Sequence, residues 1–213
     1  MKVTDKIQIT NEDNMELMAR YPDNHFELAI VDPPYTNEFR VVNSGECAKL
    51  GDYKTDSLNN NAPTDEYFNE IKRVSKNQII WGVNYYRYYL GVGRIVWDKD
   101  NTGNYSDCEL AYHSFGNVIR KFKWRWNGML QGDMKNKETR IHPTQKPVAL
   151  YKWLLDKYAK EGDKILDSHL GSGSIAIACH DYGFELTACE LDKEYYDKAI
   201  ERIKNHVAQQ SLF

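Results

Sequence analysis

The stretch that decides the fold spans residues 28–35 and reads Leu28-Ala29-Ile30-Val31-Asp32-Pro33-Pro34-Tyr35. An apolar run that ends in an acid is typical of a buried strand that carries a carboxylate to the carboxyl edge of a sheet, where open α/β sheets hold their ligands. The two prolines lack N–H groups and have restricted backbone angles, so their rigid carbonyl groups can accept hydrogen bonds from a ligand. A carboxylate, a carbonyl and an aromatic ring together suit a planar ring that carries an amino group. A strand followed by a Pro-Pro turn, with a solvated aspartate, is the alternative that these residues leave open.

A second signal lies near the other end of the chain. Residues 164–167 predict a strand, Gly171-Ser172-Gly173 predicts a sharp turn, and the small apolar residues from Ile175 onward predict a helix. The two glycines allow the backbone to approach a ligand closely, and the start of the helix offers free N–H groups. The next strand, residues 184–190, ends in Glu190, an acid that can hold a ribose diol. A dinucleotide site is the rival interpretation, but its full Gly-x-Gly-x-x-Gly spacing is absent.

Taken in this order, the two signals resemble the DNA amino-methyltransferases that use S-adenosylmethionine, in the permuted (beta-type) group whose catalytic motif precedes its cofactor motif. His142-Pro143-Thr144-Gln145-Lys146-Pro147 resembles the segment that this family places before its cofactor half. Residues 67–74, 79–86, 94–99 and 106–112 resemble the family's intermediate motifs in the expected order. The resemblance therefore covers nearly the whole chain, and Asp at position 32 resembles adenine enzymes more than cytosine-amine enzymes.

Two features depart from the family pattern. The cofactor turn begins Asp167-Ser168-His169, where the family usually has Asp-Pro-Phe. Only about 25 residues separate the last sheet motif near Phe115 from His142, where the family commonly inserts a substantial target-recognition region. We interpret His113, His169 and His180 as ordinary core or surface residues.

The resemblance implies the site residues at the matching positions. The catalytic set is Asp32, Pro33, Pro34 and Tyr35. The cofactor set is Asp13 near the adenine amine, Asp32, Thr144 and Lys146 near the cofactor's carboxylate, Asp167, Gly171, Ser172 and Gly173 near its methionine portion, and Glu190 on its ribose hydroxyls. Asp13 has a helix cap as an equal alternative, and Lys146 has a phosphate contact as a comparable one.

A mechanism follows from these roles. The exocyclic amine of a nucleobase is a poor nucleophile because its lone pair is delocalised into the ring. Hydrogen bonds from the amine to the Asp32 carboxylate and the Pro33 carbonyl would localise that lone pair toward the methyl group and stabilise the transition state. The base must flip out of the duplex, and Tyr35 is expected to stack on it. The lack of a Pro-Cys motif argues against methylation of a cytosine ring carbon.

The composition fits one intracellular domain. A chain of 213 residues with 41% hydrophobic residues can bury a sizeable core. We find no signal peptide and no apolar run that could span a membrane, and we expect a cytoplasmic, bacterial or phage-encoded protein that works at the nucleoid. The four cysteines are scattered, which favours neither a disulfide framework nor a metal site. We expect a catalytic half (1–116), a short recognition segment (117–141) and a cofactor half (142–213).

The positive charge of the chain is concentrated in one segment. Residues 117–146 hold eight basic and two acidic side chains, a net charge of +6, whereas the whole chain carries −3. Within this segment Lys121, Lys123 and Arg125 alternate with aromatic residues, so a strand would have one cationic and one aromatic face. The cationic face is expected to follow DNA phosphates. The aromatic face is expected to pack on the sheet rather than stack on bases, and a solvated basic hairpin is the alternative.

The predicted fold is a doubly wound, mostly parallel sheet of seven strands with the Rossmann-like methyltransferase architecture and a circularly permuted motif order. Helices are expected at 64–76, 147–160 and 193–209, and residues 36–63 form a disordered segment or a lid. The expected partner is double-stranded DNA, read by a monomer or a homodimer. Rival functions are a cytosine-amine DNA methyltransferase, an enzyme for RNA or a protein amide, and a DNA-binding module that keeps the cofactor without catalysis.

Overall fold

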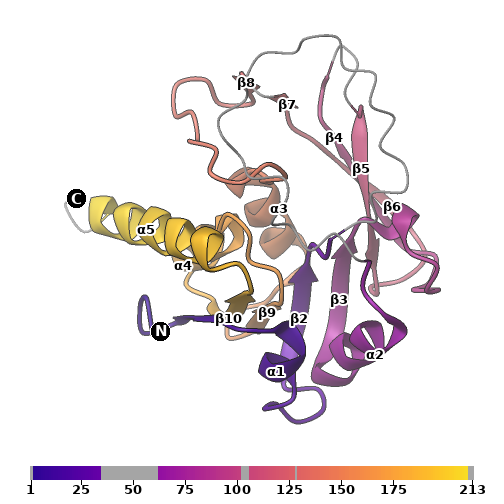
Figure 1. Cartoon of the computed structure of the whole chain (residues 1–213). Coiled ribbons are helices and arrows are strands. Elements are labelled where there is room, and N and C mark those ends of the chain that lie inside the picture. The colour runs from indigo at the N-terminus through magenta and orange to yellow at the C-terminus, as the bar shows by residue number, and fades with distance from the viewer. Residues whose placement is uncertain (1, 35–61, 102–105, 128, 211–213) are drawn as a thin grey trace.

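We describe residues 2–34, 62–101, 106–127 and 129–210 in a computed structural model of the chain. The main sheet has the spatial strand order β1-β10-β9-β2-β3-β5-β4-β6 (Figure 1). Its strands are β1 (Ile7–Asn11), β2 (Phe26–Val31), β3 (Ser75–Trp81), β4 (Arg94–Asp98), β5 (Cys108–His113), β6 (Ile119–Lys123), β9 (Lys164–Asp167) and β10 (Glu185–Glu190). Within this sheet only β5 runs antiparallel to its neighbours. The predicted doubly wound, mostly parallel α/β fold is confirmed.

The predicted strand number is wrong, because this sheet has eight strands rather than seven. The additional strand is β6, the beginning of the basic segment. It pairs in parallel with β4 from Arg94 opposite Ile119 to Asp98 opposite Lys123. The alternating sequence indicates that this segment can be extended, but alternation does not say which strand supplies its hydrogen bonds.

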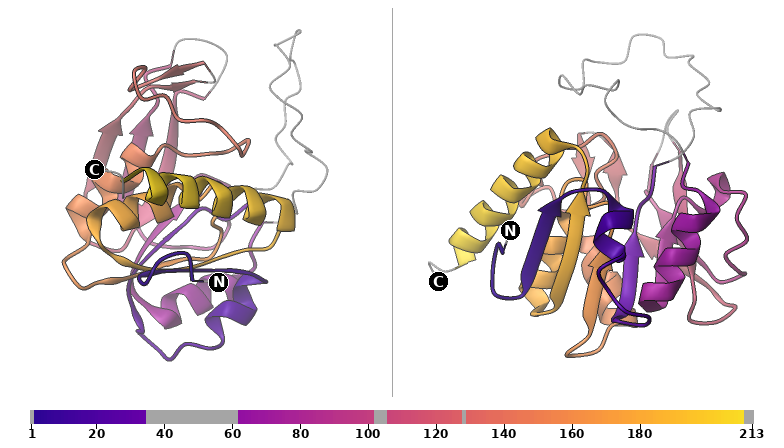
Figure 2. Two further views of the ribbon diagram at one scale, coloured as in Figure 1. Left: turned by 90° about the vertical axis from the view of Figure 1, so that its left-hand side faces the viewer. Right: turned by 60° about the horizontal axis from the view of Figure 1, so that its bottom comes forward.

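The helices cover both faces of the sheet (Figure 2). On one face, α1 (Asn14–Met18) and α2 (Asp65–Val74) enclose a cluster that includes Phe26, Val31 and Ile80. On the other face, α3 (Val148–Tyr158), α4 (Ser174–Tyr182) and α5 (Lys193–Gln210) enclose a larger cluster that includes Ile30 and Trp81. Since β2 contributes to both clusters, its continuous apolar run is explained by burial on both sides.

Local sequence accounts for α2. Its buried residues Tyr67, Phe68, Ile71 and Val74 recur at helical spacing. Acidic residues occupy the first turn and basic residues the last turn, which suits the helix dipole. Thr64 stands at the N-cap as expected, but its side chain makes no capping hydrogen bond. The helix ends two residues earlier than predicted, because Ser75 already begins β3.

The recognition segment continues from β6 into a small hairpin, β7 (Trp126–Asn127) and β8 (Leu130–Gln131). The Phe122 ring packs 5.3 Å from the Trp153 ring of α3, between ring centroids. Trp126 is buried, and its Nε1–H donates to the Gln145 carbonyl at 2.8 Å. These two aromatic residues thus pack inside the protein as expected, but against α3 and the segment before it rather than on the sheet.

The parallel strands bring several acids to one edge of the sheet. Asp32 follows β2, Asp98 ends β4, Asp167 ends β9 and Glu190 ends β10. β2 and β9 are direct neighbours in the sheet, so Asp32 and Asp167 emerge side by side. This carboxyl edge is therefore where a ligand site can form.

Some sequence-based expectations fall on residues outside the described ranges. These are Tyr35, Cys47 and nearly all of the 36–63 segment. Cys108, Cys179 and Cys189 have free thiols. In the part of the chain that the structure describes, no helix has the length and apolar character needed to span a membrane.

Candidate active site

A buried charge cluster surrounds the predicted catalytic aspartate. Lys146 is 3% exposed, and its Nζ contacts Asp32 Oδ2 and lies 3.0 Å from Glu109 Oε2. Glu109 Oε1 in turn lies 2.5 Å from Lys99 Nζ. Burial lowers the pKa of Lys146, but the charges of Asp32 and Glu109 outweigh this effect and raise that pKa above its ordinary value. Burial likewise opposes ionisation of Glu109, yet Lys146 and Lys99 hold its pKa below the ordinary value.

In this cluster Lys146 has two partners that the sequence did not predict, and its contact with the cofactor's carboxylate stays a prediction. The structure brings its ammonium to the Asp32 carboxylate, across 114 residues of sequence. Thr144, expected beside it, is exposed, and its hydroxyl lies 3.1 Å from His142 Nδ1. The sequence did not single out Glu109, although it lies in the 106–112 motif, because its partners Lys99 and Lys146 lie outside that motif.

The Pro33 carbonyl already has a partner. The hydroxyl group of Tyr86 donates to it at 2.9 Å, and the Tyr86 ring packs 5.1 Å from the Phe68 ring, between centroids. Burial and then the nearby Asp32 charge raise the pKa of Tyr86 above its ordinary value, so the hydroxyl keeps its proton as a donor. Sequence reasoning did not single out Tyr86, although it lies in the 79–86 motif.

The turn after β9 has the backbone that its glycines predict. Gly171 and Gly173 have φ values of 53° and 74°, in the left-handed region that favours glycine. The Gly171 N–H donates to Glu190 Oε2 at 2.8 Å, and the Asp192 N–H donates to Glu190 Oε1 at 3.0 Å. Burial raises the pKa of Glu190, and the Gly171 hydrogen bond opposes that rise. Ser172, between the glycines, is buried and its hydroxyl lies 3.1 Å from that of Ser174.

Ser168 and His169, which stand where the family usually has Pro-Phe, form a polar network. The Asn14 amide lies 3.1 Å from His169 Nε2, and Ser168 Oγ lies 3.0 Å from His169 Nδ1 and 2.8 Å from the Tyr67 hydroxyl. Burial lowers the pKa of His169 to about 4, so its ring is neutral at pH 7. These contacts agree with the interpretation of His169 as an ordinary structural residue, although its partners in α1 and α2 could not be read from the sequence.

Two further acids flank this network. Asp167 is 2% exposed, and burial raises its pKa to about 8 although the His169 N–H donates to it at 3.0 Å. Asp13 Oδ1 accepts a hydrogen bond from the Met15 N–H at 2.7 Å, so Asp13 is the N-cap of α1. The helix-cap alternative for Asp13 is therefore observed, and a contact with an adenine amine stays a prediction.

The three cations of the recognition segment lie beside two aspartates. Lys121 Nζ lies 3.5 Å from Asp98 Oδ2, while Lys123 Nζ and Arg125 Nη2 each lie 2.8 Å from an oxygen of Asp100. All three cations are exposed. An open hollow of about 440 Å³ adjoins them and is lined by Asp100, Lys123, Trp124, Arg125, Gln131 and Gly132.

Comparison with known proteins gives similarities to DNA methylases. The sequence model of a family described as DNA methylase matches residues 98–201. The type II methyltransferase M.HpaI of Haemophilus parainfluenzae is 38% identical over 68 residues, which are 32% of this chain and 22% of that protein. The type II methyltransferase M2.DpnII of Streptococcus pneumoniae is 22% identical over 242 residues, covering 93% of this chain and 90% of that protein. The resemblance predicted from the sequence is confirmed.

Solved structures show the same fold. The crystal structure of the M1.HpyAVI-SAM complex is similar with a TM-score of 0.56 and 20% identity, over 92% of this chain and 99% of that chain. The methyltransferase-type sheet described above is thus confirmed independently of the sequence motifs.

Proposed function

We propose that this chain is a DNA methylase that transfers a methyl group from S-adenosylmethionine to the exocyclic amine of a flipped adenine at specific sites in double-stranded DNA. The observation that carries the proposal is the position of Asp32 and Pro33 at the end of β2, directly beside β9 and the turn that follows it. An amine acceptor site and a cofactor turn therefore emerge from neighbouring strands at one edge of the sheet.

The residues of the turn suit this cofactor. S-adenosylmethionine supplies a methyl group on a positively charged sulfur, together with a ribose diol and an amino-acid portion. Asp167 and Glu190 provide acids, and a side chain at Gly171 would point toward His142, whose ring lies 3.9 Å from the position of such a Cβ. The bare backbone at Gly171 leaves this space to a ligand.

The catalytic residues act by hydrogen bonding and charge. The target amine donates one hydrogen bond to the Asp32 carboxylate and one to the Pro33 carbonyl, which localises its lone pair for attack on the methyl carbon. The Pro33 oxygen has two lone pairs, so it can accept from the amine while Tyr86 holds it in place. The Lys146 ammonium contacts Asp32 Oδ2 and holds the carboxylate in place at the end of β2.

The family covers methylation of both adenine N6 and cytosine N4, so a cytosine amine is the second candidate target. We favour adenine because position 32 is Asp. We further propose that the enzyme works in the cytoplasm, on chromosomal or phage DNA, in a restriction-modification context like that of the type II relatives. Because residues 117–141 form a short recognition segment, we propose a short target sequence or a homodimer that completes the footprint.

Expression in cells that lack their own DNA methylases tests the function. DNA from these cells is digested, and the nucleosides are measured by mass spectrometry. We expect N6-methyladenosine, in the deoxy form, with wild type, and none with Asp32→Ala, which should still bind cofactor in calorimetry. N4-methylcytosine would identify the other target, and unmethylated DNA from a folded, cofactor-binding protein would refute catalysis.

A further inference from the structure

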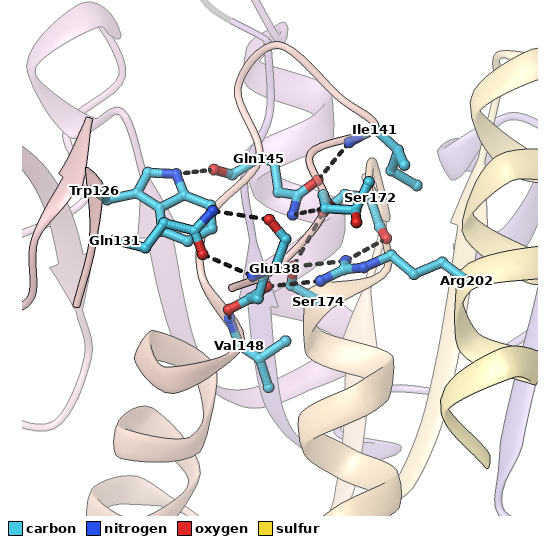
Figure 3. Close-up of polar contacts among 10 residues, drawn as sticks. Trp126, Gln131, Glu138, Ile141, Gln145, Val148, Ser172, Ser174 and Arg202 are labelled. Atoms are coloured by element: carbon cyan, nitrogen blue, oxygen red, sulfur yellow. Dashed lines mark hydrogen bonds and ion pairs between the residues drawn. The ribbon is translucent and has the colours of Figure 1, made fainter. Parts of the chain in front are cut away.

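One hydrogen-bond network joins the recognition hairpin to the cofactor turn (Figure 3). It begins at Gln131 of β8, which is 5% exposed. The Gln131 side-chain amide donates to the Glu138 carbonyl at 2.8 Å, and the Glu138 N–H donates back to Gln131 Oε1 at 2.7 Å. These reciprocal bonds fix the backbone at Glu138 relative to the hairpin.

The Glu138 carboxylate then bonds to two helices. Its Oε1 accepts from the Val148 N–H, at the start of α3, at 3.0 Å, and its Oε2 lies 2.7 Å from Arg202 Nη2 of α5. The other arm of Arg202 donates from Nη1 to the Ser172 carbonyl at 2.8 Å and to Ser174 Oγ at 3.0 Å. Ser172 is the middle residue of the glycine turn. Glu138 thus bonds directly to the hairpin, and through Arg202 to the cofactor turn.

A second branch reaches the catalytic cluster. Trp126 of β7 donates to the Gln145 carbonyl, and the Gln145 side chain accepts from the Ile141 N–H at 2.9 Å and donates to the Thr139 carbonyl at 3.2 Å. Gln145 directly precedes Lys146. The segment that carries the catalytic ammonium is therefore fixed to the same hairpin.

Because the network is largely buried, the positions of the cofactor turn, Arg202 and Glu138 are coupled. The side chains of Arg202 and Glu138 are only 13% and 21% exposed. A shift of the Ser172 carbonyl that left Arg202 behind would remove one of the acceptors of a largely buried guanidinium, which is unfavourable. A change at the turn is thus transmitted to Glu138 and from there to Gln131.

We propose that Glu138 and Arg202 are positioning residues that couple cofactor binding to DNA binding, so that each ligand strengthens the binding of the other. The proposal rests on the proposed function, since it takes the turn as the cofactor site and the hairpin as part of the DNA site. Coupling between two ligands is reciprocal, and it typically amounts to a factor of roughly 5 to 150 in affinity.

The test measures DNA affinity with and without saturating S-adenosylhomocysteine, which cannot transfer a methyl group. For wild type we expect at least about fivefold tighter DNA binding when the product is present. Glu138→Gln keeps the backbone bonds and the acceptor for Val148 but removes the charge that holds Arg202. We expect its coupling factor to fall toward 1, with S-adenosylhomocysteine affinity in the absence of DNA changed less than about threefold.

Asp181→Asn is the matched control. Asp181 of α4 pairs with Lys152 of α3 and His206 of α5, each at 2.6 Å, so it joins the same three helices outside the network. This variant should lose thermal stability but keep wild-type coupling. If Glu138→Gln does not fold, Arg202→Lys replaces it, because one ammonium cannot reach both Glu138 and the Ser172 carbonyl.

The outcomes separate the two proposals. A wild-type coupling factor of 1, or an unchanged factor in the folded network variant, overturns the inference while leaving the methyltransferase function intact. Loss of coupling in Asp181→Asn as well would also overturn it, because any destabilisation would then suffice. A wild-type protein that binds no S-adenosylhomocysteine refutes the proposed function itself.

Discussion

Lys146 has two candidate roles, one at the cofactor's carboxylate and one beside Asp32. The family resemblance assigns it to the cofactor's carboxylate, whereas in the structure its ammonium contacts Asp32 and Glu109. Three charges in a buried site are stable only when they are paired, and removing the central ammonium would leave two carboxylates facing each other. Lys146 therefore balances the two carboxylates of the cluster, one of which is the predicted catalytic residue.

Lys146→Met should lower the methylation turnover at least tenfold, which corresponds to about 1.4 kcal/mol of transition-state stabilisation. The affinity for S-adenosylmethionine should change less than about threefold. Stopped assays with labelled cofactor give the turnover, and calorimetry gives the affinity. Lys99→Met is the control, because it removes the other partner of Glu109 without contacting Asp32. Weakened cofactor binding with normal turnover would instead support the role implied by the resemblance.

The glycine turn gives a second prediction at this scale. Glu190→Ala removes the acceptor of the Gly171 and Asp192 N–H groups, and Gly171→Val places a branched side chain at a positive φ. Both variants should bind S-adenosylmethionine at least about tenfold more weakly, since each loses interactions worth roughly 1–3 kcal/mol. Calorimetry on folded protein checks this. Unchanged affinity in both would show that the turn is not the cofactor site.

At the scale of elements, β4 and β6 form a charged pair of strands. The acids at and after the end of β4 hold the cations of the recognition segment. Asp100 has a φ of 48°, an uncommon value outside glycine, and its carboxylate lies between Lys123 and Arg125. In the proposed DNA complex, phosphates would therefore compete with Asp98 and Asp100 for these cations.

Asp100→Asn should tighten DNA binding and make its salt dependence steeper, because it releases two cations for phosphates. Each added phosphate contact changes the slope of log K against log salt by about 0.9. Conversely, replacing Lys121, Lys123 and Arg125 together by Ala should weaken binding to all sequences and flatten that slope. Titrations over a range of salt concentrations measure both effects. Asp133→Asn changes the charge by the same amount, but Asp133 bonds within its own turn, to the Lys135 and Asn136 N–H groups and the Asn136 amide, so the slope should stay unchanged.

The sequence predicts elements and motifs better than their partners. Asp32 and the glycine turn are readable because strand, turn and ligand group are contiguous in each. Glu109 and Lys146 meet only because β5 packs beside the segment before α3, and Glu138 meets Arg202 across 64 residues. Such pairings depend on tertiary packing, and single polar residues carry no pattern that marks them. For the same reason β6 was predicted as extended but not as the eighth strand.

For the whole molecule, buried titratable groups make stability depend on pH in two opposing ways. Burial lowers the pKa of His142 and of His169 to about 4, against an ordinary value of 6.5. Their contribution to stability is therefore lost as the pH falls from 6.5 toward 4, because the unfolded imidazoles take up protons first. Burial raises the pKa of Asp167 from 3.8 to about 8. The free energy of unfolding therefore falls as the pH rises from 3.8 toward 8, because the unfolded carboxyl group ionises first.

Variants at these positions should therefore differ from wild type in opposite directions. The melting temperature of His169→Gln minus that of wild type, both at the same pH, should be higher at pH 5 than at pH 7.5. For Asp167→Asn, the same difference in melting temperature should be higher at pH 8 than at pH 5. Thermal melts of the two variants and wild type across this range provide the measurement. A pH-independent difference for either variant would mean that the residue titrates alike in folded and unfolded chains.

The strand order also has a consequence for folding during synthesis on the ribosome. In space, β9 and β10 lie between β1 and β2, although they are the last strands of the sheet to be translated. The nascent chain therefore cannot close its sheet, and the apolar edge of β2 that leads to Asp32 has no neighbour on that side until residue 164 has emerged. Contacts over such long sequence separations slow folding and expose strand edges to aggregation. We expect the enzyme to gain its catalytic and cofactor sites in a single late step, when the C-terminal strands insert, and to depend on chaperones until then.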